Sequence, residues 1–349
     1  MSKQPGKIAQ WLARIMDAFA TSPADSGFVR WSKRGMLLLI PLFLFGCVLS
    51  WYWSREPDVF WVNQGPPGQE AISGYATTDT LIRAVETLLD KPGGYLLNDI
   101  GPPGVVLDNM PNWEYGVLVQ VRDLSRVLRN DYSRSQSQST EDPDLAEAEP
   151  AFNFPSDSWI LPPTEREYRK GVGYVRAYRD RLVDPVDEST QFFSRADNLR
   201  EWLAVVEKRL GSLSQRLSAS VGQDRVNTDL AGEAAASSAT AQSTDVFVKT
   251  PWYEIDDVFY ESRGTAWALV HFLRAAELDF REVLDKKNAA VSLRQIIREL
   301  EASLSPVRSP IILNGHGFGM FANHSLVMAN YLSRANAAVI DLRDLLAQG

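Results

Sequence analysis

Apolar side chains recur along the second half of the chain with the spacing of a coiled-coil helix. Between residues 192 and 217 they fall alternately four and three positions apart, which keeps one stripe on one helix face for more than three heptads. The same alternation returns at 255–283 and at 328–346. Together with the lack of a convincing alternating run, these stripes predict an all-α fold. The expected architecture is an antiparallel helical bundle with coiled-coil-like seams.

The seams also predict where the longest helices lie, near residues 189–217, 250–285 and 320–347. Seams of this length can join helices of one chain or of two chains. Because several of them occur in the same chain, packing within the molecule is the favoured interpretation. A homo-oligomer is the alternative.

Two stretches interrupt the helical pattern. Residues 133–150 and 218–245 lack an apolar repeat and are rich in Ser, Gln, Ala and acidic residues. Such composition is typical of segments that do not bury a core face, so both are expected to be flexible loops. They divide the sequence into helical blocks at about 72–132, 152–217 and 250–349.

Near the N-terminus lies an apolar run of a different kind. Residues 36–53, MLLLIPLFLFGCVLSWYW, contain no charge, and as a helix they would reach about 27 Å. This length is near the lower limit for crossing the hydrocarbon core of a bilayer. The aromatic cluster at 51–53 suits a membrane interface, and Pro41 is tolerated in a lipid-buried helix. The run predicts one transmembrane helix, with a buried helix of a globular domain as the alternative.

Charge on either side of the run predicts its orientation. Residues 1–35 hold six basic and two acidic side chains, whereas residues 54–349 hold 30 basic and 42 acidic ones. Positively charged flanks stay in the cytoplasm. We therefore expect a cytoplasmic basic tail at 1–35, a transmembrane helix at 36–53 and a helical domain at 54–349 outside the cytoplasm. In a bacterium this is a single-pass inner-membrane protein with a periplasmic domain.

The tail and the run allow further interpretations. Residues 8–19 carry apolar side chains at helical spacing, which predicts an amphipathic helix lying on lipid headgroups or against a partner. A cleaved signal peptide is disfavoured because aromatic residues, not small ones, follow the run. Lipidation of Cys47 is disfavoured because Phe45 stands where a small residue is usual. A Cys packed within the span is the simpler interpretation.

Composition narrows the range of functions. A net charge of −8 disfavours nucleic-acid binding, which needs a basic face. One Cys excludes an intramolecular disulfide and a metal cluster held by thiolates of this chain. The glycine-rich stretch 314–319 has no Lys to reach a phosphate, and His316 and His324 lie too far apart for the paired zinc ligands of one helix. No cofactor is therefore predicted, and the Cys and His residues do not predict a metal site.

One acidic cluster is a candidate site for a ligand or metal ion. Glu254, Asp257 and Glu261 are spaced i, i+3 and i+7, so they share a helix face, and Arg263 follows among aromatic residues. Neighbouring carboxylates can act as acid and base or bind a divalent cation. A solvated acidic face is the favoured alternative.

Three segments resemble one bacterial family. They are residues 93–104, residues 109–116 and the stretch PWYEIDDVFYESRGTAWALVH at 251–271. In these segments and in its layout the chain resembles the domain of unknown function 2333 family, uncharacterised single-span inner-membrane proteins of Gram-negative bacteria. The resemblance covers almost the whole chain and implies an inner-membrane setting. It carries no catalytic residue, substrate or cofactor.

Two functions follow as expectations. The favoured one is a membrane-anchored periplasmic protein without enzymatic activity, which binds a protein partner or scaffolds an assembly in the cell envelope. The bilayer and that partner are its expected contacts. The alternative is a periplasmic enzyme or ligand-binding module that acts on the cell wall through the acidic and aromatic residues at 252–263.

Overall fold

The computed structural model describes residues 27–66, 71–136, 139–187, 189–226, 245–309, 311–316 and 319–348. Its described α-helices are α2 (Gly27–Trp53), α3 (Tyr75–Asp90), α4 (Asn109–Val127), α5 (Pro143–Phe152), α6 (Thr164–Val183), α7 (Ala196–Ser218), α8 (Ile255–Asp279), α9 (Arg281–Lys286), α10 (Ala290–Ser303) and α11 (His324–Ala347). Shorter elements are the 3-10 turns η1 (Gly104–Val106), η3 (Ala219–Val221) and η5 (Trp252–Glu254), the π-turn η2 (Leu128–Tyr132) and the strands β1 (Gln223–Val226) and β2 (Asp245–Val248). The predicted all-α class is confirmed.

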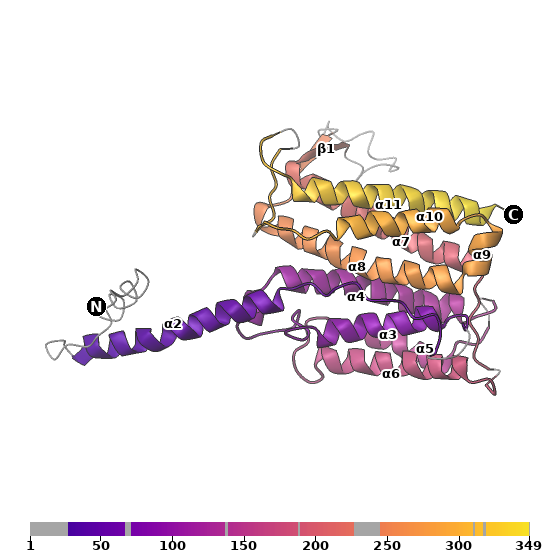
Figure 1. The fold of residues 1–349 in the computed structure, drawn as a ribbon, viewed down its shortest axis with the longest axis horizontal. Coiled ribbons are helices and arrows are strands. Elements are labelled where there is room, and N and C mark those ends of the chain that lie inside the picture. Colours follow the sequence, from indigo (N-terminus) through magenta and orange to yellow (C-terminus); the bar gives the residue numbers. More distant parts are fainter. Residues whose placement is uncertain are drawn as a thin grey trace, which may run out of the picture.

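The helices lie side by side along one direction, and α2 projects from one end of the bundle (Figure 1). Helices α4 and α8 pack against each other in the middle. On one side of this pair lie α3, α5 and α6, and on the other lie α7, α10 and α11. The C-terminus lies at the end of the bundle that is remote from α2 (Figure 1).

The seams join helices of the same chain, as favoured. Helix α7 packs along α11, and the seam side chains of both helices are buried in one hydrophobic core. On α7 these are Leu199, Leu203, Val206, Leu210, Leu213 and Leu217, and on α11 they are Met328, Leu332, Ala335, Val339, Leu342 and Leu346. The 3.5-residue spacing therefore reports an intramolecular contact between two helices far apart in sequence.

Leu203→Asp tests this seam. Leu203 is fully buried in α7, so an aspartate there would bury a carboxylate without a partner. We expect the free energy of unfolding to fall by about 3 kcal/mol or more, measured by denaturant unfolding followed by circular dichroism. Gln215→Asp, on the exposed side of the same helix, should change it by about 0.5 kcal/mol or less. Equal effects of the two substitutions would contradict the seam.

The prediction of a loop over 133–150 is wrong for its second half. Residues 143–152 form α5, whose N-terminus is capped by Asp142, the acceptor for the backbone N–H groups of Asp144 and Leu145. Leu145, Ala148 and Phe152 are buried. This stripe has three members, and the last lies beyond the predicted boundary, so the periodicity was too short to indicate a helix.

The stretch 218–245 also contains structure. Helix α7 continues into η3, and β1 pairs with β2 as an antiparallel ladder in which Gln223 faces Val248. Four-residue strands are too short to produce an alternating pattern in the sequence, which is why none was predicted. The intervening residues 227–244 lie outside the described part of the chain.

The long helices start and end differently from their predicted ranges. The helix expected over 189–217 begins only at Ala196, because the Phe192 ring packs as a loop residue against the rings of Tyr132 and Phe280, with centroids 5.1 and 5.7 Å away. The helix expected over 250–285 is divided at Phe280 into α8 and α9. Tertiary packing of aromatic rings sets both boundaries.

The uncharged run 36–53 is helical throughout and forms the second part of α2. Within the described residues, none of the helices combines the length and the hydropathy that crossing a membrane requires. The tail up to residue 26, including the expected amphipathic helix at 8–19, lies outside the described residues. The same holds for the side chains of residues 27–35, Leu37 and Leu38.

Candidate functional site

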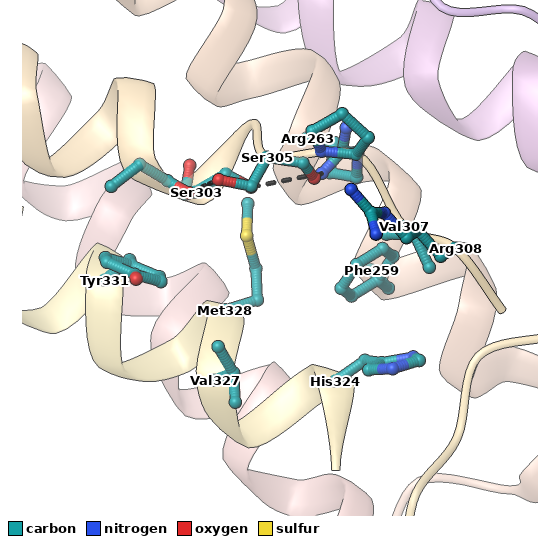
Figure 2. Close-up of a pocket in the computed structure, with 12 residues that line it drawn as sticks. Phe259, Arg263, Ser303, Ser305, Val307, Arg308, His324, Val327, Met328 and Tyr331 are labelled. Atoms are coloured by element: carbon teal, nitrogen blue, oxygen red, sulfur yellow. Dashed lines mark hydrogen bonds between the residues drawn. The ribbon is translucent and has the colours of Figure 1, made fainter. Parts of the chain in front are cut away.

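A pocket of about 300 Å³ lies where α8, α10 and α11 meet near the α2 end of the bundle (Figure 2). Figure 2 shows Phe259 and Tyr331 on opposite sides, with Met328 between them. Val307 and Val327 add apolar surface. The volume is at the lower end of the range for small-molecule sites, so the pocket suits a single short apolar group.

The first turn of α11 forms one wall of the pocket. Asn323 caps the helix by accepting a hydrogen bond from the backbone N–H of Leu326 at 2.8 Å. The backbone N–H of Leu313 donates to Nδ1 of His324 at 3.1 Å. Since Nδ1 accepts, the proton of the neutral imidazole resides on Nε2, which leaves that atom as a hydrogen-bond donor. His324 thus adds a polar group to a lining that is mostly apolar.

Arg263 holds the opposite wall in place. Its guanidinium donates from Nε and Nη2 to the two carboxylate oxygens of Glu56, at 2.6 and 2.7 Å. It also donates to three carbonyl oxygens at and just after the end of α10, those of Ser303, Leu304 and Ser305, at 3.1–3.2 Å. A cation at a helix C-terminus satisfies carbonyls without an intrahelical partner. Arg263 is therefore a structural clamp whose donors are engaged within the protein.

Arg308 differs from Arg263 because its side chain is exposed at the edge of the pocket. Together with His324, it offers a positive charge and a hydrogen-bond donor beside apolar walls. This combination can bind a group that is apolar at one end and carries a hydrogen-bond acceptor or negative charge at the other.

The three carboxylates predicted as a site have separate surroundings. Glu254 lies in η5 and is exposed. Asp257 accepts a hydrogen bond from Asn112 Nδ2 at 2.6 Å, at the start of α4. Glu261 forms an ion pair with Arg216 of α7, in which Oε2 of Glu261 lies 2.7 Å from Nη2 of Arg216. Arg263, the fourth predicted residue, is engaged by Glu56, so the structure gives each of these side chains its own partners or solvent.

The pKa of the Asp257 carboxyl is set by its surroundings near the start of α8. Burial raises the pKa of the Asp257 carboxyl, and three nearby carboxylates raise it further. These carboxylates belong to Asp256, Asp108 and Glu254. The hydrogen bond from Asn112 lowers the pKa of Asp257. Among the described residues, no group of three or more His, Cys, Asp or Glu side chains has the arrangement needed to hold a metal ion.

Comparison with known proteins identifies the family. A family model for an uncharacterized protein conserved in bacteria (DUF2333) matches residues 25–349. The chain belongs to this family. The match includes α2, the pocket and the whole helical bundle, and it confirms the resemblance noted from the sequence. Neither the curated proteins nor the solved structures contain a match.

Sequence reasoning missed the segment that joins α2 to the bundle, residues 54–63, which we call the junction segment. Glu56 binds Arg263 within it, and the Phe60 backbone N–H donates to His271 Nε2 at 2.9 Å. The Phe60 ring stacks on the imidazole, with centroids 3.9 Å apart. No local pattern could have indicated these contacts, because more than 200 residues separate the partners.

His271 makes the attachment of the junction segment sensitive to pH. Its Nδ1 lies 2.6 Å from the Trp267 carbonyl oxygen and its Nε2 accepts from Phe60, so the neutral ring satisfies both partners. Burial lowers the pKa of His271 to about 3 from its usual 6.5. Because the folded-state pKa is depressed, the stabilisation is complete above about pH 6.5 and is lost as the pH falls toward 3.

We therefore expect acid to destabilise the natural protein relative to His271→Gln, whose neutral amide can occupy the same two hydrogen bonds. Between about pH 7 and pH 5, the natural protein should lose about 2 kcal/mol of its free energy of unfolding relative to the variant. Denaturant unfolding at each pH measures this difference. If the free energies of unfolding of the two proteins change with pH in parallel across that range, His271 is not held neutral in the folded protein.

Proposed function

We propose that this protein is a single-span protein of the bacterial inner membrane, with its basic tail in the cytoplasm and its helical domain in the periplasm. In that position it acts as a binding component of the cell envelope. The observation that carries the proposal is the uncharged apolar run 36–53 of helix α2, most of whose described side chains the bundle leaves uncovered.

The exposure of α2 supports the membrane part. Within the described part of the run 36–53, large apolar side chains are exposed, among them Leu39, Leu42, Phe43 and Phe45, each at least 62% exposed. In water this surface would be very costly, whereas in hydrocarbon it is favourable. The helix ends in three aromatic residues at 51–53, a composition typical of the lipid–water interface.

Charge supports the orientation. The tail at 1–35 carries an excess of four positive charges, and the chain after the run carries an excess of twelve negative ones. By the positive-inside rule, the tail belongs in the cytoplasm and the bundle on the other side. The bundle would then lie in the periplasm.

The pocket supports the binding part. Its walls are apolar, Arg308 and His324 supply a cation and a donor at the edge, and it lies near the end of the bundle from which α2 projects. The alternative function, an enzyme acting through 252–263, receives less support. Asp257 accepts a hydrogen bond from Asn112 and Glu261 pairs with Arg216, so each carboxylate is engaged with a neighbour of its own.

Reporter fusions test the topology. We expect alkaline phosphatase joined after Gly349 to be active, and a reporter that fluoresces only in the cytoplasm to be dark at the same position. The protein should also stay in the membrane fraction after an alkaline wash. A bright reporter with inactive phosphatase would reverse the orientation, and release by the wash would refute the span.

Site-specific crosslinking in cells tests the binding role. A photoreactive phenylalanine analogue at Val327, which lines the pocket, should give a defined adduct. The same analogue at Ile340, exposed farther along α11, is the matched control and should give none. Equal labelling at both positions, or no adduct at Val327, would remove the pocket as the binding site.

A further inference from the structure

The connections of the bundle place several loops at the end next to α2 (Figure 1). The Trp53 ring packs directly on Gly93, after the end of α3. From there the loop at 95–108 contacts the loop at 153–163, because Asn98 Nδ2 donates to the Ser158 carbonyl oxygen at 2.9 Å. The starts of α4 and α8 and the segment after α10 lie at the same end, as the Asn112 and Arg263 contacts show.

These loops expose large apolar side chains, which we call the apolar rim: Ile100, Val105, Val106, Trp159, Ile160, Leu161, Trp252, Tyr253, Ile311, Met320 and Phe321. Met320 is 98% exposed and Trp252 is 84% exposed. At the opposite end of the bundle, the exposed large apolar side chains among the described residues are Val186 and Val291. The two ends of one domain therefore differ sharply in the surface they present.

Exposure of so many large apolar side chains at one end of a domain needs a partner, because exposed apolar surface is costly in water and its accumulation marks a protein or membrane contact. The rim combines Trp, Tyr and Phe with aliphatic side chains, as surfaces at the lipid–water interface do. It is distributed over four separate loops of one end and not along a groove. Such a shape fits a broad, deformable surface better than a second folded protein.

The junction segment places that end beside the bilayer. Helix α2 ends at Trp53, and Glu56 is already fixed to the bundle through Arg263. Three residues span at most about 11 Å, even when fully extended. If α2 crosses the membrane, the bundle cannot move farther away than this, and its α2 end stays within reach of the headgroup layer.

We propose that the apolar rim is a membrane-docking surface, whose side chains insert into the lipid headgroup layer of the bilayer that α2 spans. This inference rests on the proposed membrane anchoring. It adds that the domain is held with α2 and the rim both in the bilayer, and that the pocket near this end lies close to the lipid surface.

Depth-resolved fluorescence quenching tests the docking with the full chain in vesicles of phosphatidylethanolamine and phosphatidylglycerol. In a Cys47→Ser background, single cysteines replace Met320 or Ile160 of the rim, Val186 of the opposite end, or Leu42 of α2. Each cysteine is labelled with a polarity-sensitive fluorophore. Lipids carrying a doxyl quencher near the headgroup are compared with lipids carrying it near the chain end. Circular dichroism confirms that each variant has the natural helix content.

We expect the Met320 and Ile160 positions to show blue-shifted emission and stronger quenching by the shallow doxyl group than by the deep one. Leu42 should be quenched more strongly by the deep group. Val186, which is also apolar and exposed, should show neither the shift nor quenching. This pattern would place the rim in the headgroup layer.

The other outcomes separate the two proposals. If Leu42 is quenched while Met320 and Ile160 behave like Val186, docking is wrong and the membrane span stands. A blue shift at the rim that lipid quenchers do not affect, and that grows with protein density, would assign the rim to a second copy of the chain and overturn docking. If Leu42 is not quenched, the membrane anchoring is wrong and docking falls with it.

Discussion

Gly264→Ala is expected to destabilise the bundle severely, because this glycine lets α8 touch α4 backbone to backbone. A Cβ atom at Gly264 would lie 1.9 Å from the Trp113 carbonyl oxygen. On the facing helix, a Cβ atom at Gly116 would lie 2.1 Å from the Glu261 carbonyl oxygen. Neither neighbour is the end of a flexible side chain, so an added methyl group must push the two helices apart.

Separation of α4 from α8 would open the centre of the core. The Trp113 and Trp267 rings pack edge to face there, with centroids 5.2 Å apart, and both are buried. Overpacking of a core usually costs about 1–3 kcal/mol, and displacement of two backbones belongs at or above the upper end of that range. We expect a loss of about 3 kcal/mol or more, or failure to fold, for Gly264→Ala and for Gly116→Ala.

Gly173→Ala is the matched control. Gly173 also lies within a helix, α6, but beyond its own stretch of helix backbone no heavy atom lies within 4 Å of the position that its Cβ would take. Alanine has a higher helix propensity than glycine, so this variant should be more stable by about 0.5–1 kcal/mol. Denaturant unfolding in detergent micelles, followed by the helical circular dichroism signal, measures all three variants. Similar midpoints for Gly264→Ala and Gly173→Ala would show that the close approach of the helices is not needed.

Loss of the Arg263 clamp should have the second large effect. Arg263→Met keeps much of the side-chain length but removes the partner of Glu56 and the donor to three carbonyl groups. Removal of one member of a buried ion pair typically costs about 3–5 kcal/mol. The Glu56 side chain is 21% exposed, so water compensates in part, and we expect about 3 kcal/mol.

Besides lowering the free energy of unfolding, Arg263→Met should change the protein locally, at the junction segment. Without Arg263, the junction segment should be cut by protease near Glu56 faster than in the natural protein, because one of its attachments to α8 is gone. Arg308→Met is the control, since this exposed arginine lies in the segment after α10 and should change stability by about 0.5 kcal/mol or less. Unchanged stability and unchanged proteolysis in Arg263→Met would show that the clamp does not hold the junction.

Local patterns determined much of the fold. A helix imposes its 3.6-residue period on the chain itself, so an apolar stripe reveals a helix and its buried face wherever several turns carry it. The stripes on α7, α8 and α11 predicted all three helices and the seam side chains, Leu203 and Leu332 among them. They failed where a stripe was short, as in α5, or where an aromatic residue ended the helix, as Phe280 does.

The candidate site was less predictable. Arg263 was singled out from the sequence, but as a ligand-binding cation and not as the clamp of Glu56. The last apolar stripe begins at Met328, and His324 was considered as a zinc ligand. Val307 and Arg308 lie on a loop without any pattern. A pocket depends on which helices and loops pack together. The spacing of apolar residues along the sequence does not show which elements these are.

By itself, therefore, the sequence determined the all-α class, the family, the uncharged run at 36–53 and the faces that the long helices bury. The tertiary structure alone decided that Glu56 pairs with Arg263, that Phe60 binds His271, and that Asp257 and Glu261 have different partners. The physical reason is the range of each interaction. Periodicity and charge are properties of neighbouring residues, whereas partners separated by more than 200 positions are selected only when the helices pack.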